Sequence, residues 1–233
     1  MIEKVDFLII AIICIFFGAI LRKLFDYNLK KIMNIAKNQK LDDIAKKYPS
    51  NIEICKKYLE ILHNDNVIIE ENKNAKDSLY MVVMNKIIIA NIDNSYTRIQ
   101  TIAHECLHSI QERKILTFNF IYSNIYLLYY ILICVLTIFN QTTKQGMLLN
   151  VLLYMSLIYY MIRTYLEDDA MIKAKYLTKE YLEEIKISNK NEIKEMLEGF
   201  EKINKIGIRA MHYNVFNNVT LKILIYILIC LIF

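Results

Sequence analysis

Hydrophobic and polar residues gather in blocks along this chain, and four of the blocks are long and apolar. They cover residues 5–21, 118–139, 147–162 and 219–233. A helix that crosses a bilayer needs about 20 apolar residues, and the second block has this length without a single charge. Lys222 interrupts the fourth block, whose helix can begin earlier, near Val215. The pattern predicts a mainly α-helical membrane protein with about four transmembrane helices.

These apolar blocks and the charged stretches between them predict five parts of the chain. The parts are an N-terminal transmembrane anchor (1–21), a cytosolic module (22–117), a transmembrane helical hairpin (118–162), a cytosolic helical part (163–218) and a C-terminal transmembrane helix (219–233). Arg22 and Lys23 follow the first block, and no small-residue cleavage site does. We therefore interpret this block as a retained anchor and not as a signal peptide.

Lysine and arginine residues near the apolar blocks predict the orientation in the cell membrane. Only Lys4 precedes the first block, whereas six such residues follow it between residues 22 and 40, and the loop 140–146 has one lysine. Cytoplasmic loops of membrane proteins carry the excess of lysine and arginine. We expect a multi-pass protein with its N-terminus outside the cell and with residues 22–117 and 163–218 in the cytoplasm.

Composition excludes several classes of protein. The 233 residues include 4 Gly and 1 Pro, and 55% are hydrophobic, which argues against a turn-rich β sandwich or barrel and against disorder. The net charge of +5 comes without the dense arginine clusters of nucleic-acid-binding domains, and no nucleotide-binding loop is present. We expect the lipid bilayer as a partner, and neither nucleic acid nor nucleotide. The five cysteines lack the spacing of a disulfide framework or a cysteine zinc site.

Helices and one β element are predicted before the second apolar block. Helical spacing covers residues 28–38, 41–48 and 51–63. In the last of these, one apolar face consists of Ile52, Cys55, Leu59 and Leu62. Residues 79–92 are rich in β-branched side chains and are broken at Asn85-Lys86, which predicts one bent strand or a short hairpin.

A further helix is expected to begin near residues 93–97, because Asp, Asn, Ser and Thr are good N-caps. Residues 97–100 also match a capping box. The predicted buried stripe of this helix consists of Ala103, Cys106, Leu107 and Ile110. Polar residues are expected on its other faces, among them Arg98, Gln100, Glu112 and Arg113.

This helix carries the motif His104-Glu105-Cys106-Leu107-His108, which has the HExxH spacing. Residues four apart lie on one face of a helix, so both imidazoles can reach the same metal ion. Glu105 can reach a metal-bound water and act as a general base. With 4 His in the chain, chance predicts only about 0.004 matches to this spacing. The motif therefore predicts a Zn²⁺ site.

A third zinc ligand has to lie further along the chain. The second half of the metzincin motif, Gly-x-x-His, does not follow His108. Two predicted spans follow the motif and return the chain to the same side of the membrane at residues 163–170. This segment offers three carboxylates, those of Glu167, Asp168 and Asp169. The residues alone leave the choice among them open.

Two segments resemble one known family. HECLHSIQ, preceded by NKIIIANIDNSYTRIQTIA, and LEDDA are similar to segments of the membrane-anchored neutral zinc metallopeptidases, the YugP-like family. The resemblance implies a small zincin-like α+β module, a short strand or hairpin followed by the HExxH helix. It also implies a gluzincin type of site, in which Glu167 is the third ligand beside His104 and His108, and Glu105 is the general base.

The chain departs from this family pattern at three positions. Cys106 and Leu107 stand where the family has Val-Gly, and Met171 stands where related zincins often place an acid that orients a ligand histidine. Asp169 is an alternative third ligand or an outer partner that orients a ligand. The residue that orients the histidines therefore stays unassigned.

These observations predict a zinc-dependent metalloendopeptidase that hydrolyses peptides or membrane proteins at the cytosolic side of the membrane. His212, just before the last span, is a candidate donor to the tetrahedral oxyanion. An intramembrane protease is disfavoured because polar residues such as Arg98 and Arg113 flank the motif. A second alternative is a non-catalytic membrane scaffold or immunity-type protein with a structural or degenerate zinc site.

Overall fold

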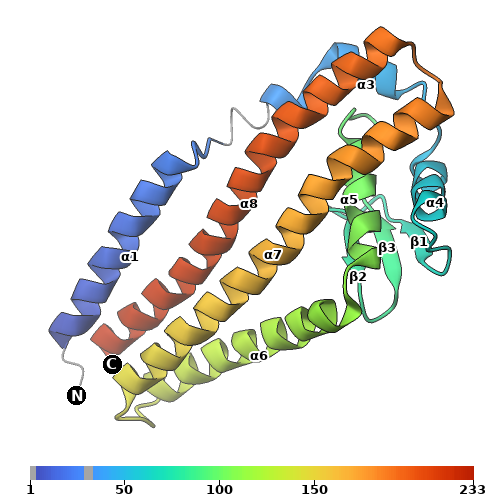
Figure 1. Cartoon of the computed structure of the whole chain (residues 1–233). Coiled ribbons are helices and arrows are strands. Elements are labelled where there is room, and N and C mark those ends of the chain that lie inside the picture. Colours follow the sequence, from blue (N-terminus) through green and yellow to red (C-terminus); the bar gives the residue numbers. More distant parts are fainter. Residues whose placement is uncertain (1–3, 29–33) are drawn as a thin grey trace. The chain divides into compact units, whose positions relative to one another are not determined.

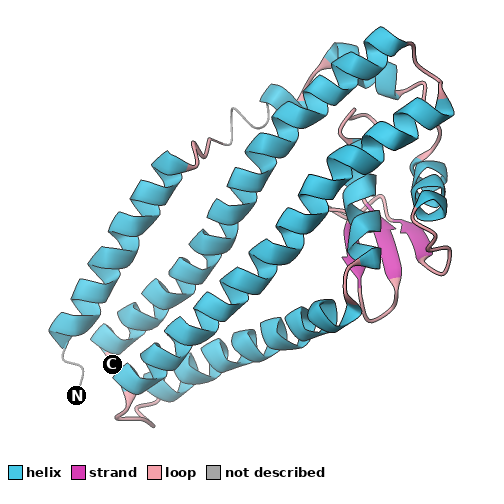
Figure 2. Ribbon diagram, in the orientation of Figure 1, coloured by secondary structure: helices cyan, strands magenta, loops and turns pink. Residues whose placement is uncertain are grey.

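The structure is a computed structural model that describes residues 4–28 and 34–233 (Figure 1). Its helices are α1 (Lys4–Leu24), α3 (Gln39–Ala45), α4 (Asn51–Ile61), α5 (Arg98–Ile110), α6 (Arg113–Ile138), α7 (Gln145–Ile185) and α8 (Lys190–Ile232). Its strands are β1 (Ile68–Glu71), β2 (Leu79–Met81) and β3 (Lys86–Ile89), which form one small sheet (Figure 2). The predicted mainly α-helical fold is confirmed. The helix predicted over 28–38 includes residues 29–33, which lie outside the described ranges.

Four helices, α1, α6, α7 and α8, are long and apolar enough to cross a membrane, which confirms the prediction of about four candidate spans. Two of them extend far beyond the apolar blocks, because α7 has 41 residues and α8 has 43. Residues 163–185 contain neither Gly nor Pro, so nothing ends α7 where its apolar half gives way to its charged half. The helices expected within 163–218 are therefore parts of α7 and α8.

Contacts divide the described chain into two units. Unit 1 comprises the described residues up to Tyr27, together with Phe118–Tyr165 and Arg209–Phe233. Its core is made of α1, α6, α7 and α8 side chains, among them Phe7, Tyr126, Leu149 and Ile223. The Lys222 ammonium donates to Asn218 Oδ1 (2.5 Å) and lies 4.9 Å from the Tyr126 ring centroid. An amide oxygen and an aromatic face thus accommodate the one charge in the last apolar block.

Unit 2 comprises the described residues of Asn28–Thr117, together with Leu166–Ile208. Its sheet has the order β1-β3-β2, with β1 parallel and β2 antiparallel to β3. β2 and β3 form a hairpin, which is one of the two forms predicted for residues 79–92. Asn85 closes its turn with a φ of 48°, a left-handed conformation that asparagine tolerates well. β1 was not predicted, because its four residues end in two glutamates and show no long apolar run.

The core of unit 2 lies between the sheet, α4, α5 and the charged half of α7. On α4 the buried apolar residues are Ile54, Cys55, Tyr58 and Leu59. The predicted face is confirmed in part, because Cys55 and Leu59 are buried and Leu62 packs against the core, whereas Ile52 does not belong to the core. Tyr58 sets the observed face, because its ring packs 4.8 Å from that of Tyr181 on α7 and its hydroxyl donates to the Ile99 carbonyl of α5.

The predicted start and stripe of α5 need two corrections. Thr97 is the N-cap but makes no side-chain capping bond, because its hydroxyl pairs with that of Ser95 instead (2.7 Å). A capping box forms at the start of α4, between Ser50 and Glu53. Ile110 was expected in the buried stripe but is 44% exposed.

Arg98, expected on an outer face of α5, is buried. Its guanidinium donates to the carbonyls of Ala45, Tyr48 and Pro49 and to Asn51 Oδ1, all within 3.0 Å. Gln100 is buried as well. Arg98 therefore ties the start of the motif helix to the connection between α3 and α4.

Replacing Arg98 with Met should destabilise the protein by about 3 kcal/mol, because several buried acceptors lose their only charged donor. The free energy of unfolding, measured by denaturant titration in detergent micelles, checks this. Arg113→Met, at an exposed position, is the control and should change stability by less than about 0.5 kcal/mol. Equal stability of the two variants would contradict the role given to Arg98.

Candidate metal centre

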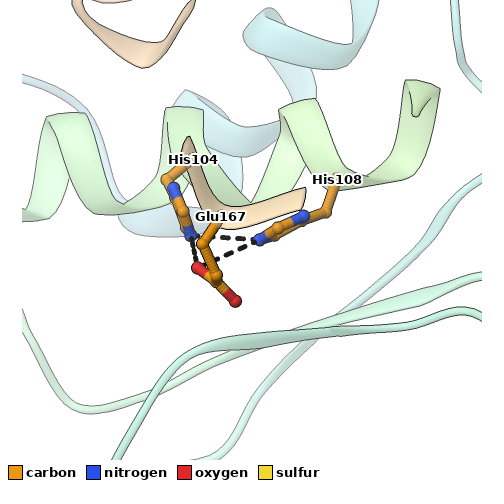
Figure 3. Close-up of side chains that lie close together, drawn as sticks. All are labelled: His104, His108 and Glu167. Atoms are coloured by element: carbon orange, nitrogen blue, oxygen red, sulfur yellow. Dashed lines mark hydrogen bonds and ion pairs between the residues drawn. The ribbon is translucent and has the colours of Figure 1, made fainter. Parts of the chain in front are cut away.

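Three side chains of unit 2 bring metal-binding atoms to one point (Figure 3). His104 and His108 extend from one face of α5, one turn apart, and Glu167 extends toward them from α7. Their donor atoms lie within 4.8 Å of one another. Glu167 is 8% exposed. The residues predicted as ligands from the motif and from the family resemblance are thus adjacent in space, although 59 positions separate His108 from Glu167 (167 − 108).

The distances fit a tetrahedral ion. His104 Nε2 lies 3.1 Å from His108 Nε2 and 3.3 Å from Glu167 Oε2, and His108 Nε2 lies 3.8 Å from Glu167 Oε2. Ligand atoms about 2.05 Å from a tetrahedral Zn²⁺ are about 3.3 Å apart. Two imidazole nitrogens and one carboxylate oxygen are also ligands that zinc accepts. The group could therefore hold a metal ion.

Gln111, the C-cap of α5, orients the ring of His108. Its Nε2 donates to the Leu166 carbonyl (2.7 Å) and to Asp169 Oδ2 (3.0 Å). Two acceptors fix the amide nitrogen on that side, so Oε1 faces His108 Nδ1 at 2.8 Å. An amide oxygen only accepts, and Nδ1 must therefore carry the proton. In the neutral ring Nε2 then holds the lone pair that a metal requires.

Sequence reasoning left this orienting residue unassigned, although the quoted motif HECLHSIQ ends with Gln111. The signal that could have identified Gln111 was its position, because it is an amide residue directly after the last turn of the motif helix. Nothing in the sequence pairs it with α7. Only the tertiary contact with Leu166 and Asp169 defines its role.

Asp169 does not belong to the group of three donors, but it accepts a hydrogen bond from Gln111, which contacts His108. Its other oxygen accepts from Lys173 Nζ at 2.6 Å. Burial acts to raise the pKa of Asp169, but the hydrogen bonds from Lys173 and Gln111 outweigh it and lower the pKa. Of the two roles considered for Asp169, the geometry matches the outer partner that orients a ligand.

Glu105 lies beside the group without joining it. Its side chain is buried, and this burial raises the pKa of its carboxyl. The charges of His104 and His108 and a hydrogen bond from the Tyr80 backbone amide on β2 act in the opposite direction. The carboxyl therefore faces both the motif histidines and the edge strand of the sheet.

The carboxylate of Glu167 influences the pKa of His108. Burial by itself lowers the pKa of His108, but the hydrogen bond and the charge of Glu167 outweigh it, and the pKa is raised. A cation therefore has to displace a proton that His108 holds to a higher pH than an ordinary histidine does. Metal affinity should weaken as the pH falls.

The motif's two unusual residues face the core. Cys106 and Leu107 are buried, and the Cys106 sulfur lies 3.5 Å from that of Cys55 on α4. Both thiols are free. Cys106 therefore packs against α4, and Leu107 belongs to the core of unit 2.

His212 lies in unit 1, whereas the donor group lies in unit 2. Its Nδ1 is 3.1 Å from the Tyr160 hydroxyl, and its ring is 6.1 Å from that of Phe25. These contacts belong to the packing of unit 1.

Comparisons of the chain with models of protein families, with curated proteins and with solved structures found no match. The functional assignment therefore depends on the sequence pattern and on the geometry of the site.

Purified protein should contain one zinc ion per chain, and His104→Ala should lose it because two donors do not retain the ion. Zinc per chain, measured by elemental analysis, checks this. His63→Ala is the matched control, because His63 is not in the donor group. Full occupancy in His104→Ala would rule out the site.

Gln111→Leu should weaken zinc binding about 10- to 100-fold, because the ring of His108 loses the acceptor that fixes its tautomer. The dissociation constant can be measured by competition with a chromogenic chelator. Glu112→Gln changes an exposed neighbour and should leave affinity unchanged. An unaltered constant in Gln111→Leu would show that the contact with α7 does not tune the site.

Proposed function

We propose that this chain is a membrane-embedded zinc metallopeptidase. The observation that carries the proposal is the convergence of His104, His108 and Glu167 at tetrahedral distances beside the buried carboxyl of Glu105. The resemblance of HECLHSIQ and LEDDA to the YugP-like metallopeptidases supports it. HExxH spacing with a glutamate from a later helix is the gluzincin arrangement.

A set of three protein ligands favours a catalytic ion over a structural one. Structural zinc sites are closed by four protein ligands, whereas catalytic sites keep one position for water or substrate. Within the described ranges, the group comprises His104, His108 and Glu167 alone. When bound, zinc supplies a Lewis acid that acidifies a water molecule and polarises a peptide carbonyl.

Glu105 moves the proton in the proposed reaction. Its carboxylate accepts a proton from the attacking water and returns it to the nitrogen of the departing amine, so that water and peptide give an acid and an amine. Burial raises the pKa of this carboxyl, which makes it able to hold the proton between the two steps. The Tyr80 backbone amide donates a hydrogen bond to the Glu105 carboxylate. This bond lowers the pKa of Glu105 and so favours the deprotonated form that acts as the base.

The proposed enzyme acts at the cytosolic side of the cell membrane. The lysine and arginine distribution around the four candidate spans supports this orientation. Peptides or exposed segments of membrane proteins are the proposed substrates.

Glu105→Gln should abolish hydrolysis of a fluorogenic peptide library by the purified protein and should keep its zinc, because Glu105 is not a ligand. Loss of a general base typically costs about 10²- to 10⁴-fold in rate. Glu112→Gln, which alters an exposed glutamate just beyond the motif helix, is the control. Equal hydrolysis by Glu105→Gln and the parent chain would refute the mechanism.

Binding of a small hydroxamate, measured by calorimetry with and without zinc, tests the open position separately. Metal-dependent binding supports a catalytic ion. A protein that retains zinc, binds no hydroxamate and cleaves no peptide would instead be the non-catalytic alternative.

A further inference from the structure

The charged half of α7 and the first part of α8 enclose a groove on the surface of unit 2. The two helices run antiparallel here, because a turn at 186–189 joins them and the Lys175 ammonium pairs with Glu201 (3.3 Å). The groove has a volume of about 800 Å³. It extends along about 15 Å, the rise of α7 from Lys175 to its end at Ile185. A helical segment of about ten residues, or a shorter extended one, matches this length.

Three apolar side chains line the groove, and we call Tyr176, Ile193 and Leu197 the apolar strip. Tyr176 is 66% exposed. Ile193 and Leu197 lie one turn apart on α8 and also pack against the core of unit 2. The strip can accept an apolar side chain of a ligand, since it combines an open aromatic ring with side chains that the fold holds in place.

The charges around the groove are unevenly paired. Lys175 pairs with Glu201, and the Lys179 ammonium lies 3.9 Å from the Glu183 carboxylate. The other lysines of the lining pair with no carboxylate among the residues that the structure describes, and all of them are exposed. We call these three residues the lysine end of the groove: Lys186, Lys190 and Lys194.

The stability of the fold does not explain the lysine end. Lys190 is the first residue of α8, where the helix dipole disfavours a positive charge. Lys194 lies four residues further on, and like charges at this spacing repel each other along a helix. Lys186 has a φ of 52°, a left-handed conformation that Gly or Asn adopts more readily. The three lysines therefore cost stability at these positions, and an anionic ligand would offset that cost.

We propose that this groove binds an acidic peptide segment of a partner protein. Carboxylates of the segment pair with the lysine end, and an apolar side chain of the segment packs on the apolar strip. Charge complementarity selects an acidic ligand, and the apolar strip selects one that also carries apolar side chains. The inference does not rest on peptidase activity, because the lining of the groove includes none of the three donors.

Other anionic partners fit the groove less well. Glu183, Glu198 and Glu201 also line it, and they repel a partner whose charge is negative throughout, such as an anionic bilayer or a nucleic acid. The groove is concave, so a flat bilayer surface does not fill it. A peptide can place its carboxylates at the lysine end alone and keep uncharged side chains beside the glutamates.

Fluorescence anisotropy of a labelled peptide tests the proposal on the purified full chain in an uncharged detergent. The probe has about ten residues and mixes glutamate with leucine, and its matched control has glutamine in place of each glutamate. The acidic peptide should bind saturably and more weakly as salt rises, and the control peptide should bind at least about tenfold more weakly. Equal binding of the two peptides, or no saturable binding of the acidic one, would overturn the proposal.

The double variant Lys190→Gln/Lys194→Gln should weaken binding of the acidic peptide about tenfold, because two lysines of the lysine end lose their charge. Lys202→Gln/Lys205→Gln makes the same charge change at exposed positions of α8 outside the groove and should leave binding unchanged. Tyr176→Ser, at an exposed position, should weaken binding without altering its salt dependence. Equal weakening by the two double variants would indicate unspecific attraction and would overturn the proposal.

His104→Ala distinguishes the groove from the metal centre and should bind the acidic peptide as the parent chain does. Loss of binding in this variant would place the peptide at the metal centre and overturn the proposal. Peptide binding by a chain that cleaves no peptide would support the groove and count against the proposed function alone. Light scattering tests the other occupant: a dimer that Lys190→Gln/Lys194→Gln abolishes would assign the groove to a second copy of the chain and would also overturn the proposal.

Discussion

The contact between the Gln111 amide and α7 is the interaction on which the geometry of the site depends. α5 alone can place His104 and His108 on one face, but it cannot fix their distance from a carboxylate on another helix. Gln111 bonds at once to His108, to the Leu166 carbonyl and to Asp169. The bond to Leu166 holds the next residue, Glu167, beside the two histidines. The bond to His108 sets the tautomer of that ring.

Several charged groups of unit 2 are kept out of water. Glu105, Glu167 and Arg98 are all buried, and burying a charge is costly unless hydrogen bonds or opposite charges offset the cost. Arg98 meets backbone carbonyls and serves the fold. The two glutamates face histidines, an arrangement that a bound cation would complete. Apolar side chains would fill the same space at less cost, so the polar group indicates function rather than stability.

The long helices explain how a small unit acquires residues that are distant in sequence. α7 passes without a break from an apolar half into the half that carries Glu167, because residues 147–185 contain neither Gly nor Pro. α7 also carries a candidate span, so this one helix contributes both to that span and to the donor group. In α8, Lys222 is tolerated because Asn218 and two tyrosine rings solvate it.

The sequence by itself determined the four apolar helices and the HExxH pair, because each depends on local spacing: long apolar runs and an i, i+4 interval. It left residues 79–92 open between one bent strand and a hairpin, and the pairing of β2 with β3 decided for the hairpin. It narrowed the third donor to Glu167, Asp168 and Asp169, and a family resemblance singled out Glu167. The tertiary structure decided the rest. The buried role of Arg98, the exposed Ile110, the missing bond at Thr97 and the orienting bond of Gln111 all depend on partners from other elements. These contacts join residues that are far apart in the sequence, and local sequence patterns do not specify them.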